Sequence, residues 1–321
     1  MNGTAHFDSL ASAARALPPR PLHLAMGMFD GMHLGHRAVV ESAVQSAQRE
    51  GGVAAALTFH PHPSRLLRPQ EPVQLIQSPE LRARHLRAAG VAAVITQAFT
   101  PELSRLEAEA FLPFLRQCLP QLTTVYVGEN WRFGRGRRGD VALLNEEARR
   151  LGLAVVSAPR INHNGEPISS TRIRACLEAG DIRMANTLLG YTYTSTGVVA
   201  EGKKLGRTLG FPTLNLPWSP ECRPRYGVYA VRVRSGAIGE RTWRAVANYG
   251  VRPTVETAAV PQLEAHLLEP GCPFEAGAML AAEWLHFLRP EQRFADLAEL
   301  RTQIAVDVVA ARHWFDGPGG G

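Results

Sequence analysis

The chain has 321 residues and a net charge of +6, with 45% hydrophobic and 20% charged residues. This length fits two domains of ordinary size, and the composition is typical of a soluble globular protein. No apolar stretch reaches the length of a membrane span, and the first twenty residues lack the apolar core of a secretory signal. The cysteines (Cys118, Cys176, Cys222 and Cys272) are scattered and form no CxxC motif, so we expect reduced thiols and a cytoplasmic location.

Arginine carries almost all of the positive charge, because Lys203 and Lys204 are the only lysines. A basic protein can bind nucleic acid, an acidic membrane surface or small phosphorylated substrates. The arginines are dispersed over both halves and aromatic residues make up only 7%, which favours neither nucleic acid nor a membrane as partner. We attribute most arginines to compositional bias and expect functional cations where basic residues stand among Gly, Ser and Thr.

The N-terminal half alternates short apolar runs with amphipathic runs. This alternation predicts a parallel sheet with helices on both faces and ligands at the carboxyl ends of its strands. The predicted strands are residues 22–29, 53–59, 92–99, 123–127 and 153–158, and the predicted helices are residues 36–49, 79–89, 102–118 and 141–151.

After Gly190 the pattern changes to antiparallel strands, separated by Gly and Pro turns and followed by one long helix. The fold class is therefore α/β followed by β, with a small barrel as the second domain. We predict domains at residues 1–187 and 188–316 and a disordered tail at residues 317–321. The predicted strands are residues 195–199, 227–233, 241–248, 262–268 and 279–287, and the helix covers residues 296–315, with apolar positions at Leu297, Leu300, Ile304, Val308 and Ala311.

The segment GMFDGMHLGH, residues 27–36, follows the first predicted strand and opens the first predicted helix. Its glycines allow a close approach of backbone to ligand, and the helix start offers N–H groups and a positive dipole end to a phosphate. His33 and His36 could both point at one phosphate and stabilise its transition-state charge. Two alternatives stay open: capping or surface histidines, and a zinc pair, which lacks a third ligand.

The segment ISSTRIR, residues 168–174, places three hydroxyls and two arginines before a helix that runs to residue 179. Helix capping alone would explain the hydroxyls. With a nucleotide at residues 27–36, the same groups could grip its triphosphate, and an arginine could take the leaving pyrophosphate.

The segment GENWRFGRGRRGD, residues 128–140, contains a GxGxxG pattern at residues 134–139. A dinucleotide site would need an acidic residue at the end of the next strand, and residues 153–161 offer none. The arginines suggest a mobile basic loop that could close over an anionic substrate. The alternative is a solvated basic turn, which applies to Arg135, Arg137 and Arg138.

Residues 197–204 come near to a P-loop, but Lys204 replaces the Ser or Thr of that motif and no helical pattern follows, so we reject a P-loop fold. Further on, Thr213 and Asn215 lie two apart and would share one face of an extended strand. Their oxygen atoms could hold Mg²⁺ on ATP, with ordinary turn chemistry as the alternative.

Glu264 and His266 share one face of a predicted strand, opposite its leucines. Glu264 could deprotonate an attacking hydroxyl, although any half-exposed strand alternates in this way. His60 and His62 stand at a strand end as loop residues that could approach the adenine side of the first segment.

These motifs, in this order, resemble the bacterial bifunctional riboflavin kinase/FAD synthetase family. The resemblance implies a Rossmann-like nucleotidyltransferase domain followed by a riboflavin-kinase-like barrel. It also implies two reactions: MgATP phosphorylates riboflavin to FMN, and a second ATP adenylylates FMN to FAD with release of pyrophosphate. The resemblance covers residues 22–314 and rests on GMFDGMHLGH, TFHPHP, GENWRFGRGRRGD, ISSTRIR, GRTLGFPTLNL, GVYAV, NYGVRPT, EAHLL and LRPEQRFADLAELRTQIAVD.

The resemblance assigns a role to each matching residue. In the kinase reaction, Glu264 would be the general base, Thr213 and Asn215 would hold Mg²⁺ and phosphate, Gly206 and Arg207 would lie near ATP, and Arg289 near flavin. In the adenylyl transfer, His33 and His36 would stabilise the α-phosphate, Ser170, Thr171 and Arg174 would hold the triphosphate, Asn130 would position a phosphate, and Gly27, Phe29, Asp30, Gly31 and Gly35 would line the nucleotide site.

Two alternatives remain from the sequence. The first keeps the fold with adenylyl transfer alone, because residues 273–277 depart from the Asp-x-Tyr-Gly-like turn of the family. The second is a non-catalytic basic regulator that binds RNA or flavin, which would gather its arginines in one stripe with exposed aromatic side chains. The sequence indicates no oligomeric state.

Overall fold

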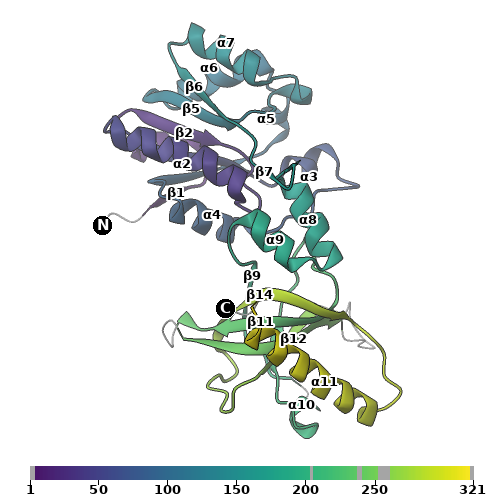
Figure 1. Ribbon diagram of the computed structural model, residues 1–321. Helices are drawn as coiled ribbons and strands as arrows, with labels where there is room; N and C mark the ends of the chain where they lie inside the picture. The colour runs from purple at the N-terminus through teal and green to yellow at the C-terminus, as the bar shows by residue number, and fades with distance from the viewer. Residues whose placement is uncertain (1–3, 203–204, 237–240, 252–260, 319–321) are drawn as a thin grey trace. The chain divides into compact units, whose positions relative to one another are not determined.

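The protein divides into two compact units, residues 1–170 and 171–321 (Figure 1). The structure is a computed structural model that describes residues 4–202, 205–236, 241–251 and 261–318, without the side chains of Leu205 and Arg207. Helices α8 (Ser170–Ala179) and α9 (Ile182–Leu189) fall almost wholly in the second unit. The domain boundary at residues 187/188 stays a prediction.

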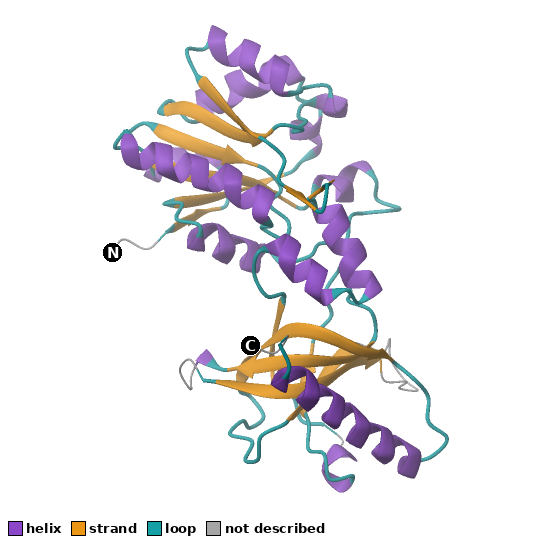
Figure 2. Ribbon diagram, viewed as in Figure 1, coloured by secondary structure: helices purple, strands orange, loops and turns teal. Residues whose placement is uncertain are grey.

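The first unit is built on a six-stranded parallel sheet with strand order β1-β4-β3-β2-β5-β6 (Figure 2). The five predicted strands all belong to it, and a short edge strand, β1, is added. The chain reverses its direction of progress across the sheet at β2, so β2 and β5 flank the switch point where such sheets bind ligands. The strands are β1 (Ala5–Phe7), β2 (Leu22–Met26), β3 (Val53–His60), β4 (Ala93–Ala98), β5 (Leu122–Gly128) and β6 (Ala154–Ala158).

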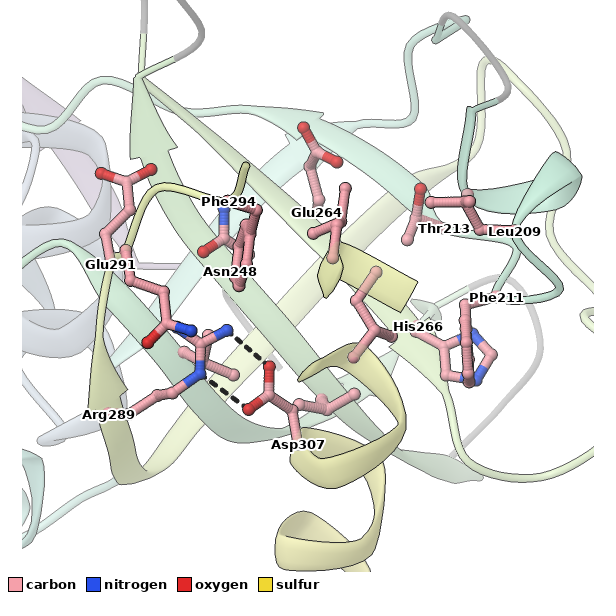
Figure 3. Close-up of a pocket in the computed structure, with 16 residues that line it drawn as sticks. Leu209, Phe211, Thr213, Asn248, Glu264, His266, Arg289, Glu291, Phe294 and Asp307 are labelled. Atoms are coloured by element: carbon pink, nitrogen blue, oxygen red, sulfur yellow. Dashed lines mark hydrogen bonds and ion pairs between the residues drawn. The ribbon is translucent and has the colours of Figure 1, made fainter. Parts of the chain in front are cut away.

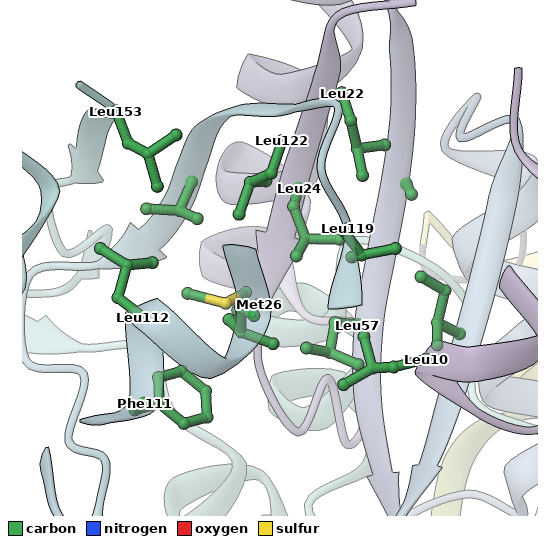
Figure 4. Close-up of a cluster of buried hydrophobic side chains, with 14 of the residues drawn as sticks. Leu10, Leu22, Leu24, Met26, Leu57, Phe111, Leu112, Leu119, Leu122 and Leu153 are labelled. Atoms are coloured by element: carbon green, nitrogen blue, oxygen red, sulfur yellow. The ribbon is translucent and has the colours of Figure 1, made fainter. Parts of the chain in front are cut away.

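Helices cover both faces of this sheet because successive strand residues point to opposite sides. Leu22, Leu24 and Met26 face α1, α6 and α7 in one buried cluster (Figure 4). Ala25 faces the opposite way, toward α2 and α4. The helices are α1 (Leu10–Ala16), α2 (Leu34–Arg49), α3 (Pro63–Leu67), α4 (Pro79–Ala88), α5 (Pro101–Ser104), α6 (Ala108–Cys118) and α7 (Val141–Arg150), with a 3₁₀ turn at Arg135–Arg137 and a hairpin of β7 (Asn162–His163) and β8 (Glu166–Pro167).

The single helix predicted for residues 102–118 is wrong, because α5 and α6 are separate helices. Glu107 has extended backbone as the N-cap of α6. The carbonyl of Leu106 accepts a hydrogen bond from the Arg135 N–H at 2.7 Å instead of continuing a helix. A contact that is distant in sequence therefore sets this break, and periodicity alone does not reveal it.

The second unit is a six-stranded antiparallel sheet with strand order β10-β13-β12-β11-β14-β9. The residues after β9 bridge to β10, where the Ala200 N–H bonds the Asn215 carbonyl at 2.9 Å, so the sheet curls into a nearly closed barrel. The predicted α/β-then-β fold is thus confirmed. The elements are β9 (Thr194–Val198), α10 (Leu205–Thr208), β10 (Leu214–Pro217), β11 (Gly227–Arg234), β12 (Thr242–Val251), β13 (Pro261–Leu267), β14 (Met279–Pro290) and α11 (Leu297–Asp316).

The barrel has an aromatic interior, and its outer face is covered in part by α11. Tyr229, Tyr249 and Trp284 are fully buried, and both tyrosines pack edge to face on Trp284. On the outer face, α11 packs its Ala311 and Phe315 against β11 and β12. The prediction that Leu297 belongs to the apolar stripe of this helix is wrong, because that side chain, in the first turn, is 55% exposed. Of the predicted tail, Gly317 caps α11, and residues 319–321 lie outside the described residues.

Candidate active sites

The loop of residues 27–36 has an unusual backbone. Phe29 and Met32 have φ angles of 51° and 39°, and Gly31 has a φ of 85°. Left-handed backbone is strained for side chains such as Phe and Met and costs on the order of 1–3 kcal/mol per residue. Both side chains are buried, so packing within the first unit holds the loop in this shape.

Asp30 braces this loop from inside the protein. Its side chain is 2% exposed, and its carboxylate accepts hydrogen bonds from the backbone N–H groups of Ile76, at 3.0 Å, and Gln77, at 3.4 Å. The Gln77 amide donates in turn to the Phe29 carbonyl at 3.2 Å. Asp30, predicted to line the nucleotide site, is therefore turned toward the segment before α4.

Arg82 is a second brace, and sequence reasoning missed it. This α4 side chain is buried and donates to the carbonyls of Met28, at 3.2 Å, and Phe59, at 3.4 Å, so it ties the loop to the end of β3. Burial lowers the pKa of Arg82 below the usual range of a guanidinium. The available signal was its position beside Ala83 and Leu86 on the buried face of the helix.

His33 and His36 form a stacked pair at the start of α2. Their ring centroids lie 3.7 Å apart with planes 18° from parallel, and Phe29 packs edge-on to His36. His33 caps the helix, because its Nδ1 accepts the His36 N–H at 3.3 Å. In the neutral ring, Nε2 then carries the hydrogen and can donate it to an anion. The capping interpretation and the anion-binding interpretation of His33 are thus compatible.

A zinc site gains no support here. Among the residues that the structure describes, no three His, Cys, Asp or Glu side chains are grouped to hold a metal ion.

Residues of two further segments were predicted at the same nucleotide site. Asn130 is exposed just beyond β5, at the switch point. The Ser170 hydroxyl donates to the Asp30 carbonyl at 2.8 Å, which joins the ISSTRIR segment to the loop of residues 27–36. Thr171 and Arg174 lie near the start of α8 in the second unit, and their approach to the histidines stays a prediction.

The GxGxxG segment forms a bridged turn. Phe133 and Gly139 exchange two backbone hydrogen bonds of 3.1 and 2.9 Å, and a Cβ on Gly139 would lie 2.7 Å from the Phe133 ring. Arg135 and Arg138 pair with Glu107 at 3.1 and 3.3 Å. Two arginines of this segment are therefore engaged by a carboxylate, and the mobility of the loop and its closure over an anion stay predictions.

In the second unit, one row of paired positions crosses five adjacent strands. Asn215 pairs with Glu264, Glu264 with Asn248, Asn248 with Val228, and Val228 with Arg289. Directly paired residues point to the same face of a sheet. Antiparallel register thus gathers predicted site residues that are up to 74 positions apart in sequence, since 289 − 215 = 74.

A cavity of about 260 Å³ lies over four residues of this row, between the sheet and α11 (Figure 3). Glu264, Asn248, Val228 and Arg289 line it, and Asn215 does not. Glu264 and Thr213 border one side, and Arg289 borders the other. Asp307 of α11 accepts two hydrogen bonds of 2.7 Å from the Arg289 guanidinium and another of 2.9 Å from Gln303. Asp307 was missed in the sequence, although an acidic residue on the stripe of Leu300, Ile304 and Ala311 was a usable signal.

Thr213 and Asn215 offer oxygen atoms suited to Mg²⁺. Asn215 is 8% exposed, and its buried Oδ1 has no hydrogen-bond partner among the described residues. The Thr213 hydroxyl lies beside Gly206, where a Cβ would come within 3.3 Å of it and would collide with the Phe211 carbonyl. Hard oxygen donors from one or two residues, completed by substrate phosphates, are the usual protein contribution to a Mg²⁺ site. The Arg207 side chain, also predicted near ATP, lies outside the described residues.

Comparison with known proteins identifies the family of this chain. A family model described as FAD synthetase matches residues 17–172, and one described as riboflavin kinase matches residues 189–315. The bifunctional riboflavin kinase/FMN adenylyltransferase of Escherichia coli (strain K12) is 36% identical over 293 residues, covering 91% of this chain and 92% of that protein. The chain belongs to this family.

Other relatives agree over the same length. The bifunctional riboflavin kinase/FMN adenylyltransferase of Bacillus subtilis (strain 168) is 32% identical over 302 residues, with 91% and 92% coverage. A crystal structure described as a macrolide-efflux protein from Streptococcus pneumoniae has a TM-score of 0.84 at 25% identity, covering 97% of this chain and 99% of that chain. Within the described part of this chain, no helix combines the length and apolar character that crossing a bilayer requires.

The departure from the family at residues 273–277 lies outside the lining of the cavity in the second unit. Phe274 is buried and packs edge to face on Trp243 at 4.7 Å. None of these five described residues lines the cavity that holds Glu264 and Arg289. The altered turn therefore contributes no side chain to this cavity.

Proposed function

We propose that the chain phosphorylates riboflavin at the cavity of the second unit and adenylylates the resulting FMN at the loop of residues 27–36. This proposal is supported by membership of a family that is named for both reactions, together with two separate groups of polar side chains suited to them. The stacked histidines His33 and His36 form one site, and the paired positions Asn215 and Glu264 anchor the other.

In the kinase reaction, the Glu264 carboxylate accepts the proton of the ribityl 5′-hydroxyl as that oxygen attacks the γ-phosphorus of ATP, and the bond from this phosphorus to ADP breaks. The Thr213 hydroxyl and Asn215 Oδ1 would hold Mg²⁺, which neutralises phosphate charge when it is bound. Arg289, fixed by Asp307, contacts the flavin across the cavity, and Gly206 keeps the backbone open beside ATP. Arg207 adds a cation there.

In the adenylyl transfer, an FMN phosphate oxygen attacks the α-phosphorus of ATP and the bond to pyrophosphate breaks. The Nε2–H of His33 and the ring of His36 stabilise the negative charge on the α-phosphate. Gly27, Gly31 and Gly35 let the backbone approach the nucleotide. Phe29 orients His36, and Asp30 braces the loop. Ser170, Thr171 and Arg174 hold the triphosphate, and Asn130 positions the FMN phosphate or the ATP phosphates.

The proposal extends to the ligands, the partners and the location of the protein. We expect riboflavin, FMN, FAD, ATP and pyrophosphate as ligands, with neither nucleic acid nor membrane as a partner, and a cytoplasmic location. Cell fractionation tests the location, and a gel-shift titration with RNA tests the absence of nucleic-acid binding.

One assay tests both activities. The protein is incubated with riboflavin, ATP and Mg²⁺, and flavins are separated by chromatography over time. We expect FMN to appear first and FAD to follow, and FAD to form from FMN supplied directly. No FMN from riboflavin, with FAD still made from FMN, would reduce the proposal to adenylyl transfer. No turnover of either flavin would overturn it.

A further inference from the structure

His266 lies two residues beyond Glu264 on the same face of β13 and lines the same cavity (Figure 3). Its Nδ1 is 2.8 Å from the backbone carbonyl of Pro212, and its ring packs edge to face on Phe211 at 5.4 Å. A carbonyl oxygen only accepts hydrogen bonds, so Nδ1 carries the hydrogen and donates it. The interaction therefore fixes both the tautomer and the orientation of this imidazole.

The Pro212 carbonyl belongs to the segment that leads into the proposed Mg²⁺ ligands. Pairing between β10 and β13 runs from Pro217 opposite Gln262 to Leu214 opposite Ala265. One step further, Thr213 stands opposite His266, outside the paired residues. Proline has no N–H to extend the ladder. The His266 side chain thus binds the strand just beyond the point where backbone pairing ends.

The other end of this segment is also fixed. The Phe211 N–H donates to the Gly206 carbonyl at 2.7 Å. Gly206 lies so close to Phe211 and Thr213 that no side chain fits at its position. The backbone of residues 211–213 is therefore held by Gly206 on one side and by His266 on the other, with the Thr213 hydroxyl between them.

We propose that His266 is a positioning residue for MgATP in the kinase reaction. Its Nδ1–H holds the Pro212 carbonyl and thereby sets the place of the Thr213 hydroxyl; this role rests on the kinase function proposed above. His266 acts through the backbone and does not touch the reacting atoms. It governs how well the nucleotide is held, and the flavin side of the cavity, around Arg289, does not depend on it.

Two isosteric substitutions separate this role from a general packing role. In His266→Asn the amide nitrogen takes the place of Nδ1 and can still donate to Pro212, whereas in His266→Gln the amide nitrogen takes the place of Nε2 and cannot. Loss of one such hydrogen bond should raise the KM for MgATP by roughly five- to tenfold in the Gln variant. We expect the Asn variant to stay within about twofold of the unchanged protein, since it keeps that bond.

The measurements are steady-state KM values for MgATP and for riboflavin, and calorimetric titration of MgADP. We expect the Gln variant to lose MgADP affinity while its KM for riboflavin and its synthesis of FAD from FMN are unchanged. Equal losses in the Asn and Gln variants, or a riboflavin KM that rises as much as the MgATP KM, would overturn the positioning role. If the unchanged protein makes no FMN, the kinase proposal fails; MgADP titration still decides whether His266 positions a nucleotide, and absent binding overturns both.

Discussion

In the first unit, one continuous loop of residues 27–36 supplies both histidines, whereas in the second unit the row from Asn215 to Arg289 takes one residue from each of five strands. The loop carries positive φ angles at Phe29 and Met32 and is held by Asp30 and Arg82. The row depends on sheet register instead. Loss of Asp30 or Arg82 should therefore disturb the loop of the first unit, whereas a shift in strand register should disturb the row of the second unit.

The largest expected effect comes from a substitution in the row of the second unit, and it distinguishes the two proposed sites. Glu264→Ala should lower FMN formation by roughly 10²–10⁴, the range for loss of a general base, and should leave FAD synthesis from FMN unchanged. Chromatographic rates for the two reactions measure this. Gln262→Ala on the same strand, outside the cavity lining, is the matched control and should keep both activities. Equal loss of both reactions in a folded Glu264 variant would contradict the division into two sites.

His36→Ala should have the reverse effect. Removing a donor to the α-phosphate should lower the rate of FAD synthesis from FMN by roughly 10²–10³ while FMN formation continues. His313→Ala, an exposed residue at the end of α11, controls for loss of any histidine. A His36 variant that still makes FAD at the normal rate would remove this residue from the proposed mechanism.

A buried and an exposed carboxylate of α11 can be compared with each other, with a smaller expected effect on activity. Asp307 is 8% exposed in its pair with Arg289, and Asp316 is 70% exposed in its pair with Arg244. Because Asp307→Asn leaves a largely buried guanidinium without its partner, we expect the riboflavin KM to rise by roughly tenfold or more. Asp316→Asn should change it less than about twofold, as for an exposed pair. Similar KM values in both variants would show that Arg289 needs no fixed orientation.

The smallest expected effect is a dependence of stability on pH in the first unit. His23 is fully buried in β2, with Nδ1 2.9 Å from the Tyr126 hydroxyl, and burial lowers the pKa of His23 from its usual 6.5. The unfolded chain therefore takes up a proton before the folded one as pH falls. Stability should be unaffected above pH 6.5 and should fall as the pH drops from there toward the folded pKa, by on the order of 1 kcal/mol.

His85 on α4 should also make stability fall as the pH drops, because burial lowers its pKa to about 4. Urea unfolding is measured at pH 7.5 and 5.5, with loss of FAD synthesis as the signal. The difference between the two free energies of unfolding gives the combined effect of His23 and His85. His23→Leu should reduce the difference between the two pH values. A free energy of unfolding that is equal at both pH values would contradict the buried neutral state of His23.

The sequence was sufficient for most sheet strands and for the order of the two folds, because apolar runs of four to eight residues and their spacing are local signals. It was not sufficient for the short strands β1 and β10, which pair with β4 and β13. Nor did it predict the end of α5, because the Leu106 carbonyl is engaged by Arg135. Both depend on partners far along the chain.

The site residues divide in the same way. The His33–His36 spacing and the Thr213–Asn215 spacing were visible, since two or three residues on a known element fix relative direction. The inward turn of Asp30 was not visible, because it depends on the N–H groups of Ile76 and Gln77. Residues that act through tertiary partners leave only a weak signal, as a charge on a buried face.

Complementation tests the central claim of two independent active sites most directly. Glu264→Ala and His36→Ala proteins are each incubated with riboflavin, ATP and Mg²⁺, separately and mixed, and FAD is measured by chromatography. Separately, the first should leave riboflavin unchanged and the second should stop at FMN. The mixture should convert riboflavin to FAD, because FMN released by one protein is adenylylated by the other. A mixture of folded variants that makes no FAD would contradict the claim.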